Sequence, residues 1–261
     1  MEFISKLLSK VAARFSFICC CLSWVSMHQY ISNASCDFVF LVFRLGESVE
    51  FKNISALEIS NNPAEPEPSE PKIRFVAGIH GNAPVGTELL LEFAAYLCIN
   101  YGKNRAISKL INETRIFIVP SINPDGREQA AEKKCSSSRG LTNSNDKDLD
   151  KTFFGPEACS IFHKLFFLSF PTLTGNSMQH LVEPEPETRA MMNFIQSNDF
   201  SLSVALDGGA LVVTYPYDKP VQTGNTTLYT TLKYLANVYA RNHPKMHPGD
   251  TACSNNGQSM T

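Results

Sequence analysis

Segments with the character of buried strands alternate along this chain with segments of helical periodicity. The expected strands are 72–79, 115–120 and 201–206, and the expected helices are 87–100, 187–196 and 226–241. This alternation predicts an α/β fold, with a mixed, mostly parallel, twisted sheet that carries helices on both faces. Ligands of such sheets bind at the loops beyond the carboxyl ends of the strands. The loops of first interest are therefore 80–86, 121–126, 140–151 and 207–218.

Composition excludes several other classes of protein. The 261 residues are 43% hydrophobic and 18% charged, which is typical of a globular domain rather than a disordered chain. Because 23 Lys and Arg nearly balance 25 Asp and Glu, we expect no nucleic-acid partner. No apolar run reaches the ~18 residues of a transmembrane helix, so we expect no membrane span in this chain.

Sequons and cysteines bear on the cellular compartment. Four Asn-x-Ser/Thr sequons lie at Asn33, Asn53, Asn112 and Asn225. Chance gives roughly one per two hundred residues, so these four favour a secreted or lumenal protein. We take Asn53, Asn112 and Asn225 as candidate glycosylation sites. The eight cysteines form no Cys-x-x-Cys pair, which argues against a zinc finger.

The N-terminus allows two interpretations. Residues 15–27 follow Lys6, Lys10 and Arg14 and resemble the apolar region of a signal peptide. Apolar residues also recur at helical spacing over 2–15, which predicts an amphipathic surface helix instead. Whether the chain has a signal peptide of its own stays open at this point.

Six motifs occur in order in these loops and in the elements beside them. They are IHGNAPVGTELLL, TRIFIVPSINPDGRE, DLDKTF, PETRAMM, LSVALDGGALVVTYPYD and ARNHPKMH. Together they resemble the zinc metallocarboxypeptidases of the carboxypeptidase N/E type, and among these a catalytically degenerate copy. The resemblance covers about residues 43–153 and 183–253, with a weaker match at 1–15. It implies the metallocarboxypeptidase fold with the C-terminal part missing.

The resemblance implies a zinc ion held by two histidines and one glutamate, with an open position for water. The first two family ligands form His-x-x-Glu, and here that stretch runs from His80 to Ala83. The third ligand, a histidine in the family, is Asp207 in this chain. Alanine offers no lone pair, so His80 is the one family ligand retained. We therefore expect zinc in the family but none bound in this chain.

The substrate positions implied by the resemblance are changed as well. The family holds the terminal carboxylate of its peptide with an Arg that follows Gly and with an Asn-Arg pair. Here Leu141 follows Gly140, and Asp150 and Lys151 replace the pair. Leu141 donates no hydrogen bond, Asp150 repels a carboxylate, and Lys151 carries a charge without the guanidinium fork. The general-base Glu and a substrate-binding Tyr are expected beyond Thr261, so we assign no catalytic residue.

The matched glycines and one acidic residue have structural interpretations. The glycines mark turns that need positive φ or close backbone approach; they are Gly81, Gly86, Gly126, Gly208 and Gly209. Glu187 and Thr188 are interpreted as the start of a helix, where the helix dipole favours an acidic group.

Two segments interrupt the family pattern, 16–41 and 154–182, and both are rich in Phe, Cys and Ser. We interpret them as splice or gene-model insertions. The expected organisation is a divergent N-terminal segment over 1–45, a truncated metallocarboxypeptidase-like domain over 46–253 and a polar tail over 254–261.

These substitutions favour a carboxypeptidase-like domain of the secretory pathway that is catalytically inactive. It would serve as a binding or structural module with a protein or peptide as its ligand. The alternative is an active zinc carboxypeptidase that removes C-terminal Arg or Lys from peptides. That enzyme would need zinc held by His80, Asp207 and a third group, with zinc polarising the carbonyl and a Glu activating water. The resemblance also implies a membrane-anchored parent protein.

Overall fold

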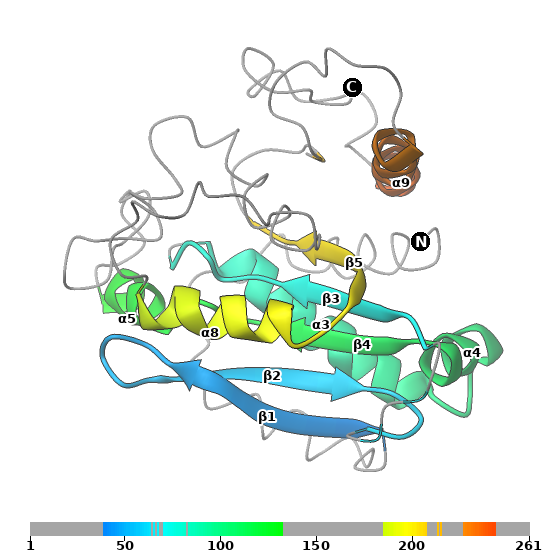
Figure 1. Ribbon diagram of the computed structural model, residues 1–261. Helices are drawn as coiled ribbons and strands as arrows, with labels where there is room; N and C mark the ends of the chain where they lie inside the picture. The colour runs from blue at the N-terminus through cyan, green and yellow to red at the C-terminus, as the bar shows by residue number, and fades with distance from the viewer. Residues whose placement is uncertain are drawn as a thin grey trace.

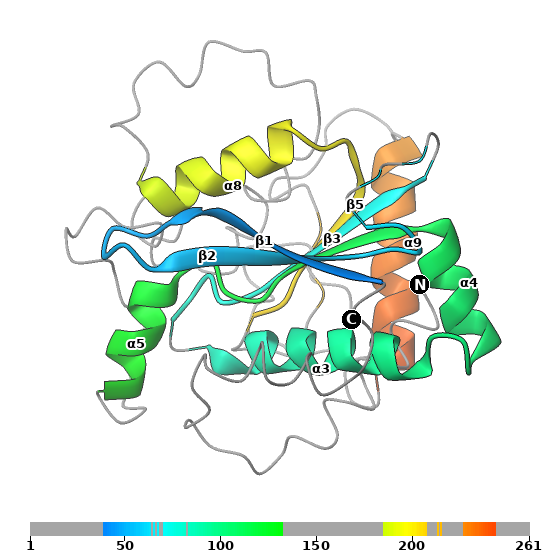
Figure 2. The same ribbon diagram turned by 90° about the horizontal axis from the view of Figure 1, so that it is seen from below.

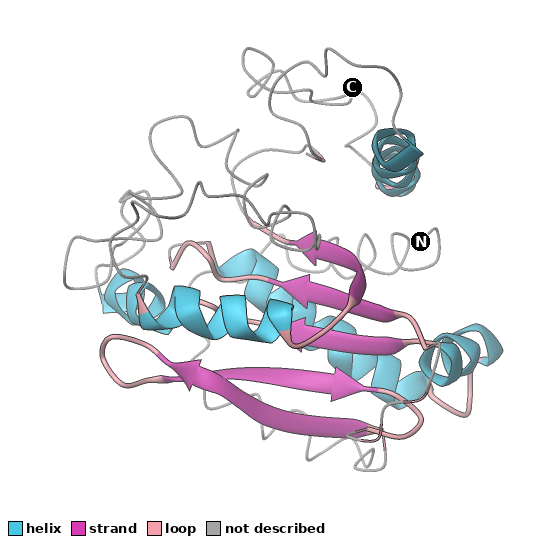
Figure 3. Ribbon diagram, viewed as in Figure 1, coloured by secondary structure: helices cyan, strands magenta, loops and turns pink. Residues whose placement is uncertain are grey.

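The computed structural model describes residues 39–63, 65, 67, 70–81, 83–132, 185–207, 213, 215 and 227–243. Its elements are, in chain order, β1 (Phe40–Glu47), β2 (Asn53–Ile59), β3 (Lys72–Val76), α3 (Pro84–Asn100), α4 (Arg105–Glu113), β4 (Arg115–Val119), α5 (Pro124–Glu132), α8 (Pro186–Gln196), β5 (Phe200–Ala205) and α9 (Thr227–Asn242) (Figure 1 and Figure 3). The expected insertion at 154–182 and the tail at 254–261 lie outside the described residues. Strand β1 crosses the domain boundary that the sequence placed at residue 46.

The described strands form one five-stranded sheet in the order β1-β2-β4-β3-β5. β1 pairs with β2 and β2 with β4 in antiparallel fashion, while β3 pairs with β4 and with β5 in parallel. The predicted mixed sheet is thus confirmed, and its described parallel and antiparallel pairings are equal in number. Two neighbouring parallel strands must be joined by a crossover connection, and the helices that lie between these strands in the chain supply it.

Helices cover both faces of this sheet (Figure 2). α3 packs on one face, where the ring centroids of Phe75 and Phe93 lie 5.3 Å apart. α8 packs on the other face, where the ring of Phe194 lies 5.6 Å from Phe117 and 5.2 Å from Phe200. Edge-to-face aromatic pairs of this kind fix the helix on the sheet beyond the effect of burial alone. In the part of the chain described here, no helix is both long and apolar enough to cross a membrane.

Helix α4 lies where the sequence predicted no element. Its N-cap is Asn104, whose Oδ1 accepts hydrogen bonds from the backbone N–H groups of Ala106 (3.0 Å) and Ile107 (3.3 Å). Ile107 and Ile111, one helical turn apart, are both fully buried. A capping asparagine ahead of an apolar i, i+4 pair is the local signal for a short helix.

Helix α5 corrects a second expectation. The sequence predicted a polar loop from residue 126 to 150, but α5 extends to Glu132. Pro124 occupies the first position of the helix, where a missing N–H costs nothing. Asn123 Oδ1 accepts from Gly126 N at 2.8 Å and so caps the first turn. Polarity alone suggested a loop because this helix has no wide apolar face.

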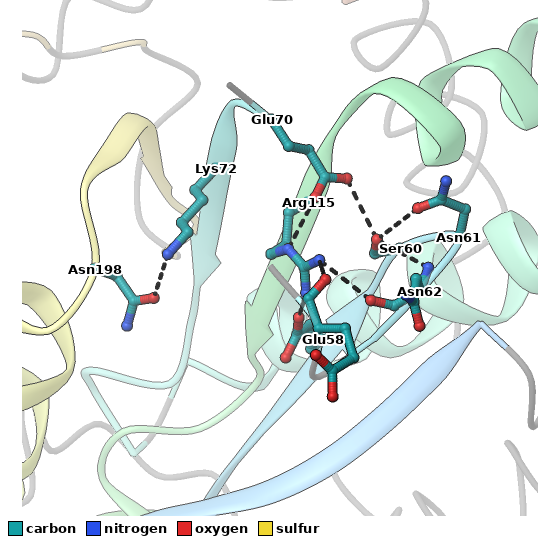
Figure 4. A network of polar contacts seen from close by, with 9 residues as sticks. Glu58, Ser60, Asn61, Asn62, Glu70, Lys72, Arg115 and Asn198 are labelled. Carbon is teal, nitrogen blue, oxygen red and sulfur yellow. Dashed lines mark hydrogen bonds and ion pairs between the residues drawn. The ribbon is translucent and has the colours of Figure 1, made fainter. Parts of the chain in front are cut away.

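A buried ionic cluster fastens the loop between β2 and β3 to the sheet (Figure 4). Arg115 forms an ion pair with Glu58 and a second one with Glu70, whose Oε2 lies 3.0 Å from Nε. Its Nη2 also donates to the carbonyl oxygens of Asn62 (3.2 Å) and Glu65 (2.7 Å). The three charged side chains are at most 9% exposed, so one guanidinium compensates two desolvated carboxylates.

Candidate functional site

The carboxyl ends of β3 and β5 lie side by side, and this brings two of the predicted site residues together (Figure 1). Val76 and Ala205 are the last register partners of the two strands. Leu206 N then donates to Val76 O at 2.9 Å, which extends the pairing by one residue. His80 follows the first strand and Asp207 the second, so both side chains reach the same loop region.

His80 and Asp207 form a close polar pair. Nδ1 of His80 and Oδ2 of Asp207 lie 2.5 Å apart and share a hydrogen bond. The two side chains are 19% and 8% exposed, so the contact is largely shielded from water. The carboxylate therefore occupies the Nδ1 side of the imidazole ring.

These residues do not fit the zinc ion of a carboxypeptidase. Bonds of about 2.0–2.1 Å around a tetrahedral zinc place two ligand atoms about 3.3 Å apart. Nδ1 and Oδ2 lie closer than that, with no room for a shared ion between them. Ala83 stands at the second family ligand position, and its methyl side chain has no donor atom. Within the described residues, no group of three or more His, Cys, Asp or Glu side chains could hold a metal.

Ala83 has a structural task instead. It is the N-cap residue of α3, it makes no side-chain capping bond, and Pro84 follows as the first helical residue. Its backbone N–H donates to the carbonyl oxygen of His80 at 3.0 Å. The turn from His80 into α3 is thus closed by the main chain, without help from the side chain at position 83.

Two glycines let the elements around the site approach each other closely. A Cβ on Gly81 would overlap the backbone of Gly126, so the loop after β3 touches the first turn of α5 through its main chain. A Cβ on Gly86 would lie 2.6 Å from the carbonyl oxygen of Leu206. The close approach interpreted for Gly81 and Gly86 is confirmed; Gly208 and Gly209 lie outside the described residues.

A second polar cluster near the site was not predicted. Buried Asp125, in the first turn of α5, accepts from Ser48 Oγ (2.6 Å) and from Glu50 N (3.0 Å). Glu187, in the first turn of α8, accepts from Val49 N at 3.1 Å. Both carboxylates therefore hold the turn between β1 and β2. The helix start interpreted at Glu187 is confirmed, but its contact with this turn had no signal in the sequence.

Burial raises the pKa of Glu187 above the ordinary carboxyl value. The charges of Asp125 and Glu185 add to this rise, while hydrogen bonds from the backbone of Glu187 and Val49 oppose it. Its Oε2 is buried and has no hydrogen-bond partner among the described residues. The ionised form of Glu187 therefore loses solvation free energy on burial.

The remaining predicted residues divide into two groups. Asn53 and Asn112 are exposed, as a glycosylation site requires, and Tyr101 donates its hydroxyl to Asn112 Oδ1 at 2.9 Å. Leu141, Asp150, Lys151 and Asn225 lie outside the described residues, and their roles remain predictions.

Comparison with known proteins decides the family. The family model described as zinc carboxypeptidase matches residues 27–261, which is most of the chain. The chain belongs to the zinc carboxypeptidase family. The resemblance carried by the six motifs is confirmed, and zinc is the metal of this family.

Relatives of this zinc carboxypeptidase domain are much longer than the chain itself. Carboxypeptidase D of Homo sapiens is 55% identical over 212 residues, which cover 81% of this chain and 13% of that protein. The carboxypeptidase N catalytic chain of Rattus norvegicus is 36% identical over 244 residues, 84% of this chain and 51% of that one. The chain therefore spans a small part of carboxypeptidase D and about half of carboxypeptidase N.

Solved structures agree with the zinc carboxypeptidase fold. Thrombin activatable fibrinolysis inhibitor has a TM-score of 0.59 at 18% identity, covering 82% of this chain and 52% of its own. Carboxypeptidase A from Helicoverpa armigera has a TM-score of 0.60 at 19% identity, covering 92% and 59%. At this identity the likeness shows the fold alone.

Proposed function

We propose that this chain is a catalytically inactive carboxypeptidase-like domain that acts by binding a protein or peptide. The observation that carries the proposal is the 2.5 Å contact between His80 Nδ1 and Asp207 Oδ2. Hydrolysis by this family depends on an open zinc site with three protein ligands. Here one ligand position is alanine and the other two bond to each other.

The binding role follows from what the loops retain. The close contacts of Gly81 and Gly86 hold the loop after β3 against the first turn of α5 and the start of α3 against the loop after β5, without a metal. Loops held by a rigid sheet at its carboxyl edge are the usual place for ligand recognition in α/β folds. A protein or peptide is the ligand class closest to what the named relatives, all carboxypeptidases, act on.

The proposed compartment is the secretory pathway. Two sequon asparagines, Asn53 and Asn112, are exposed on the described surface. Cys98, in α3, is disulfide-bonded, a state that persists in oxidising compartments and is rare in the cytosol. Both features support the same location.

Zinc content tests the proposal directly. The purified chain is dialysed against zinc-buffered solution, its fold is verified by circular dichroism, and bound zinc is measured by inductively coupled plasma mass spectrometry. We expect well below one zinc per chain, and no change with His80→Ala. The matched variant is Ala83→Glu combined with Asp207→His, which restores the family ligand set and should bind about one zinc per chain.

The competing function is an active zinc carboxypeptidase, favoured by the 55% identity to carboxypeptidase D. Near-stoichiometric zinc in the unmodified chain that is lost on His80→Ala would support it. Release of Arg or Lys from peptides that end in these residues, abolished by a chelator, would then overturn the inactive assignment.

A further inference from the structure

The turn between β1 and β2 contains an aromatic residue in an unusual backbone conformation. Phe51 N donates to Ser48 O at 3.0 Å, and Ser48 N donates to Lys52 O at 2.8 Å. In hairpin loops of this size the last residue of the loop adopts the left-handed conformation and is usually glycine. Here it is Phe51, with φ of 60°.

Phe51 is also exposed. Its relative exposure is 81%, so the ring gains little from burial while the backbone stays in a region that disfavours a side chain. The turn cannot relax easily, because buried Asp125 and Glu187 accept from the N–H groups of Glu50 and Val49. The backbone that carries this exposed ring is therefore held at a fixed place on the surface.

A sequon begins two residues later. Asn53 is the exposed first residue of β2, in the sequence Asn53-Ile54-Ser55. Ile54 is fully buried and is paired with Gly46 of β1. Because Ile54 anchors the strand, the Asn53 side chain is directed to solvent at the same end of the hairpin as Phe51.

We propose that Asn53 carries an N-linked glycan whose first N-acetylglucosamine lies against the ring of Phe51. In the modification, Asn53 Nδ2 forms a bond to C1 of an oligosaccharide donor linked to a lipid pyrophosphate. The C1–O bond to the pyrophosphate breaks, and the amide loses one proton, which leaves with the pyrophosphate. The C–H groups on one face of the sugar ring then pack on the aromatic face. The sugar thereby covers part of the exposed ring of Phe51.

The glycan proposal rests on the secretory location proposed above. Glycosylation of Asn112 tests that location separately from the contact with Phe51. Asn112 lies near the end of α4, in the sequence Asn112-Glu113-Thr114, far along the chain from Phe51. It reports whether the chain meets the glycosylation machinery, whatever Phe51 does.

Site occupancy is measured first. The full chain is expressed in animal cells with its own N-terminus, and glycopeptides are identified by mass spectrometry with and without peptide N-glycosidase F. We expect glycans at Asn53 and at Asn112. A bare Asn53 beside a modified Asn112 would overturn the glycan proposal alone. Two bare asparagines would overturn both the glycan and the secretory location.

Stability then tests the contact with Phe51. The chain is secreted behind a cleavable signal, and thermal midpoints are compared for the unmodified chain, Phe51→Ala, Asn53→Gln and the double variant. We expect Phe51→Ala to lower the midpoint by about 3 °C when Asn53 carries its glycan, and by less than about 1 °C in the Asn53→Gln background. Equal shifts in both backgrounds would overturn the contact.

Enzymatic trimming gives the same comparison without a substitution at Asn53. Endoglycosidase H leaves the first sugar on high-mannose chains, whereas peptide N-glycosidase F removes it. We expect the effect of Phe51→Ala to persist after the first treatment and to vanish after the second. Loss of the effect after endoglycosidase H would refute a contact made by the first sugar.

Discussion

Arg115 allows the sharpest prediction about stability. The side chain is 2% exposed, and it faces the carboxylates of Glu58 and Glu70, which are 9% and 5% exposed. Arg115→Met keeps the apolar stem but removes the charge and all hydrogen bonds of the side chain. Breaking a buried ion pair from one side costs about 3–5 kcal/mol, because the partner charge stays buried without compensation.

Two carboxylates lose one shared partner here, and the carbonyl oxygens of Asn62 and Glu65 lose a donor as well. We therefore expect Arg115→Met to lower the free energy of unfolding by about 4 kcal/mol, a large share of the 5–15 kcal/mol that is usual for a domain. With a slope of about 2 kcal/mol per molar urea, the unfolding midpoint moves by about 2 M. Circular dichroism during urea titration measures this shift.

A surface lysine provides the matched control. Lys109 lies 3.9 Å from Glu113 on α4, and the two side chains are 70% and 63% exposed. Lys109→Met should change the free energy of unfolding by no more than about 0.5 kcal/mol. Adding Glu58→Gln and Glu70→Gln to Arg115→Met should recover part of the loss. A cost below about 1 kcal/mol for Arg115→Met alone would refute the view that the guanidinium compensates buried charge.

Three further predictions concern single residues. Since burial raises the pKa of Glu187, the folded chain binds this proton more tightly than the unfolded chain, and stability falls as pH rises from the ordinary carboxyl value through the raised one. Glu187→Gln should remove that fall in pH-dependent unfolding curves, and an unchanged curve would contradict the assignment. Gly81→Ala should lower the free energy of unfolding, measured in urea, by about 1–3 kcal/mol because its Cβ overlaps the backbone of Gly126. At exposed Gly102 a Cβ would meet open space, but the backbone there is left-handed. Asn104→Ala should cost about 1 kcal/mol by loss of the α4 cap, and Asn104→Asp should retain most of it.

The sequence predicted those elements whose periodicity is strong. The strand at Arg115–Val119 is entirely buried, and such strands read as continuous apolar runs. Helix α4 was missed because its signal is short, one capping asparagine and one apolar pair, and α5 was missed because its first turn depends on Asn123 rather than on an apolar face. Local capping bonds are made by single side chains, so a pattern averaged over a window does not detect them.

The turn between β1 and β2 shows a different limit. Asp125 of α5 and Glu187 of α8 are far apart in the chain, yet both accept hydrogen bonds from this turn. An acidic residue in the first turn of a helix has a sufficient local explanation in the helix dipole. The sequence therefore gave no reason to look for a distant partner, although burial of Glu187 depends on one.

The arrangement of the side chains at the family ligand positions could not be predicted from the sequence alone. From the sequence, His80 and Asp207 are one retained and one replaced ligand, and a carboxylate is itself an acceptable zinc ligand. What decides between a weakened metal site and a closed polar pair is the distance between their side chains. That distance follows from the parallel pairing of β3 with β5, in which Val76 faces Ala205 and the two strands end together. With Nδ1 and Oδ2 2.5 Å apart, the carboxylate contacts the imidazole directly, and the pair itself joins the loops that a shared ion would otherwise bridge.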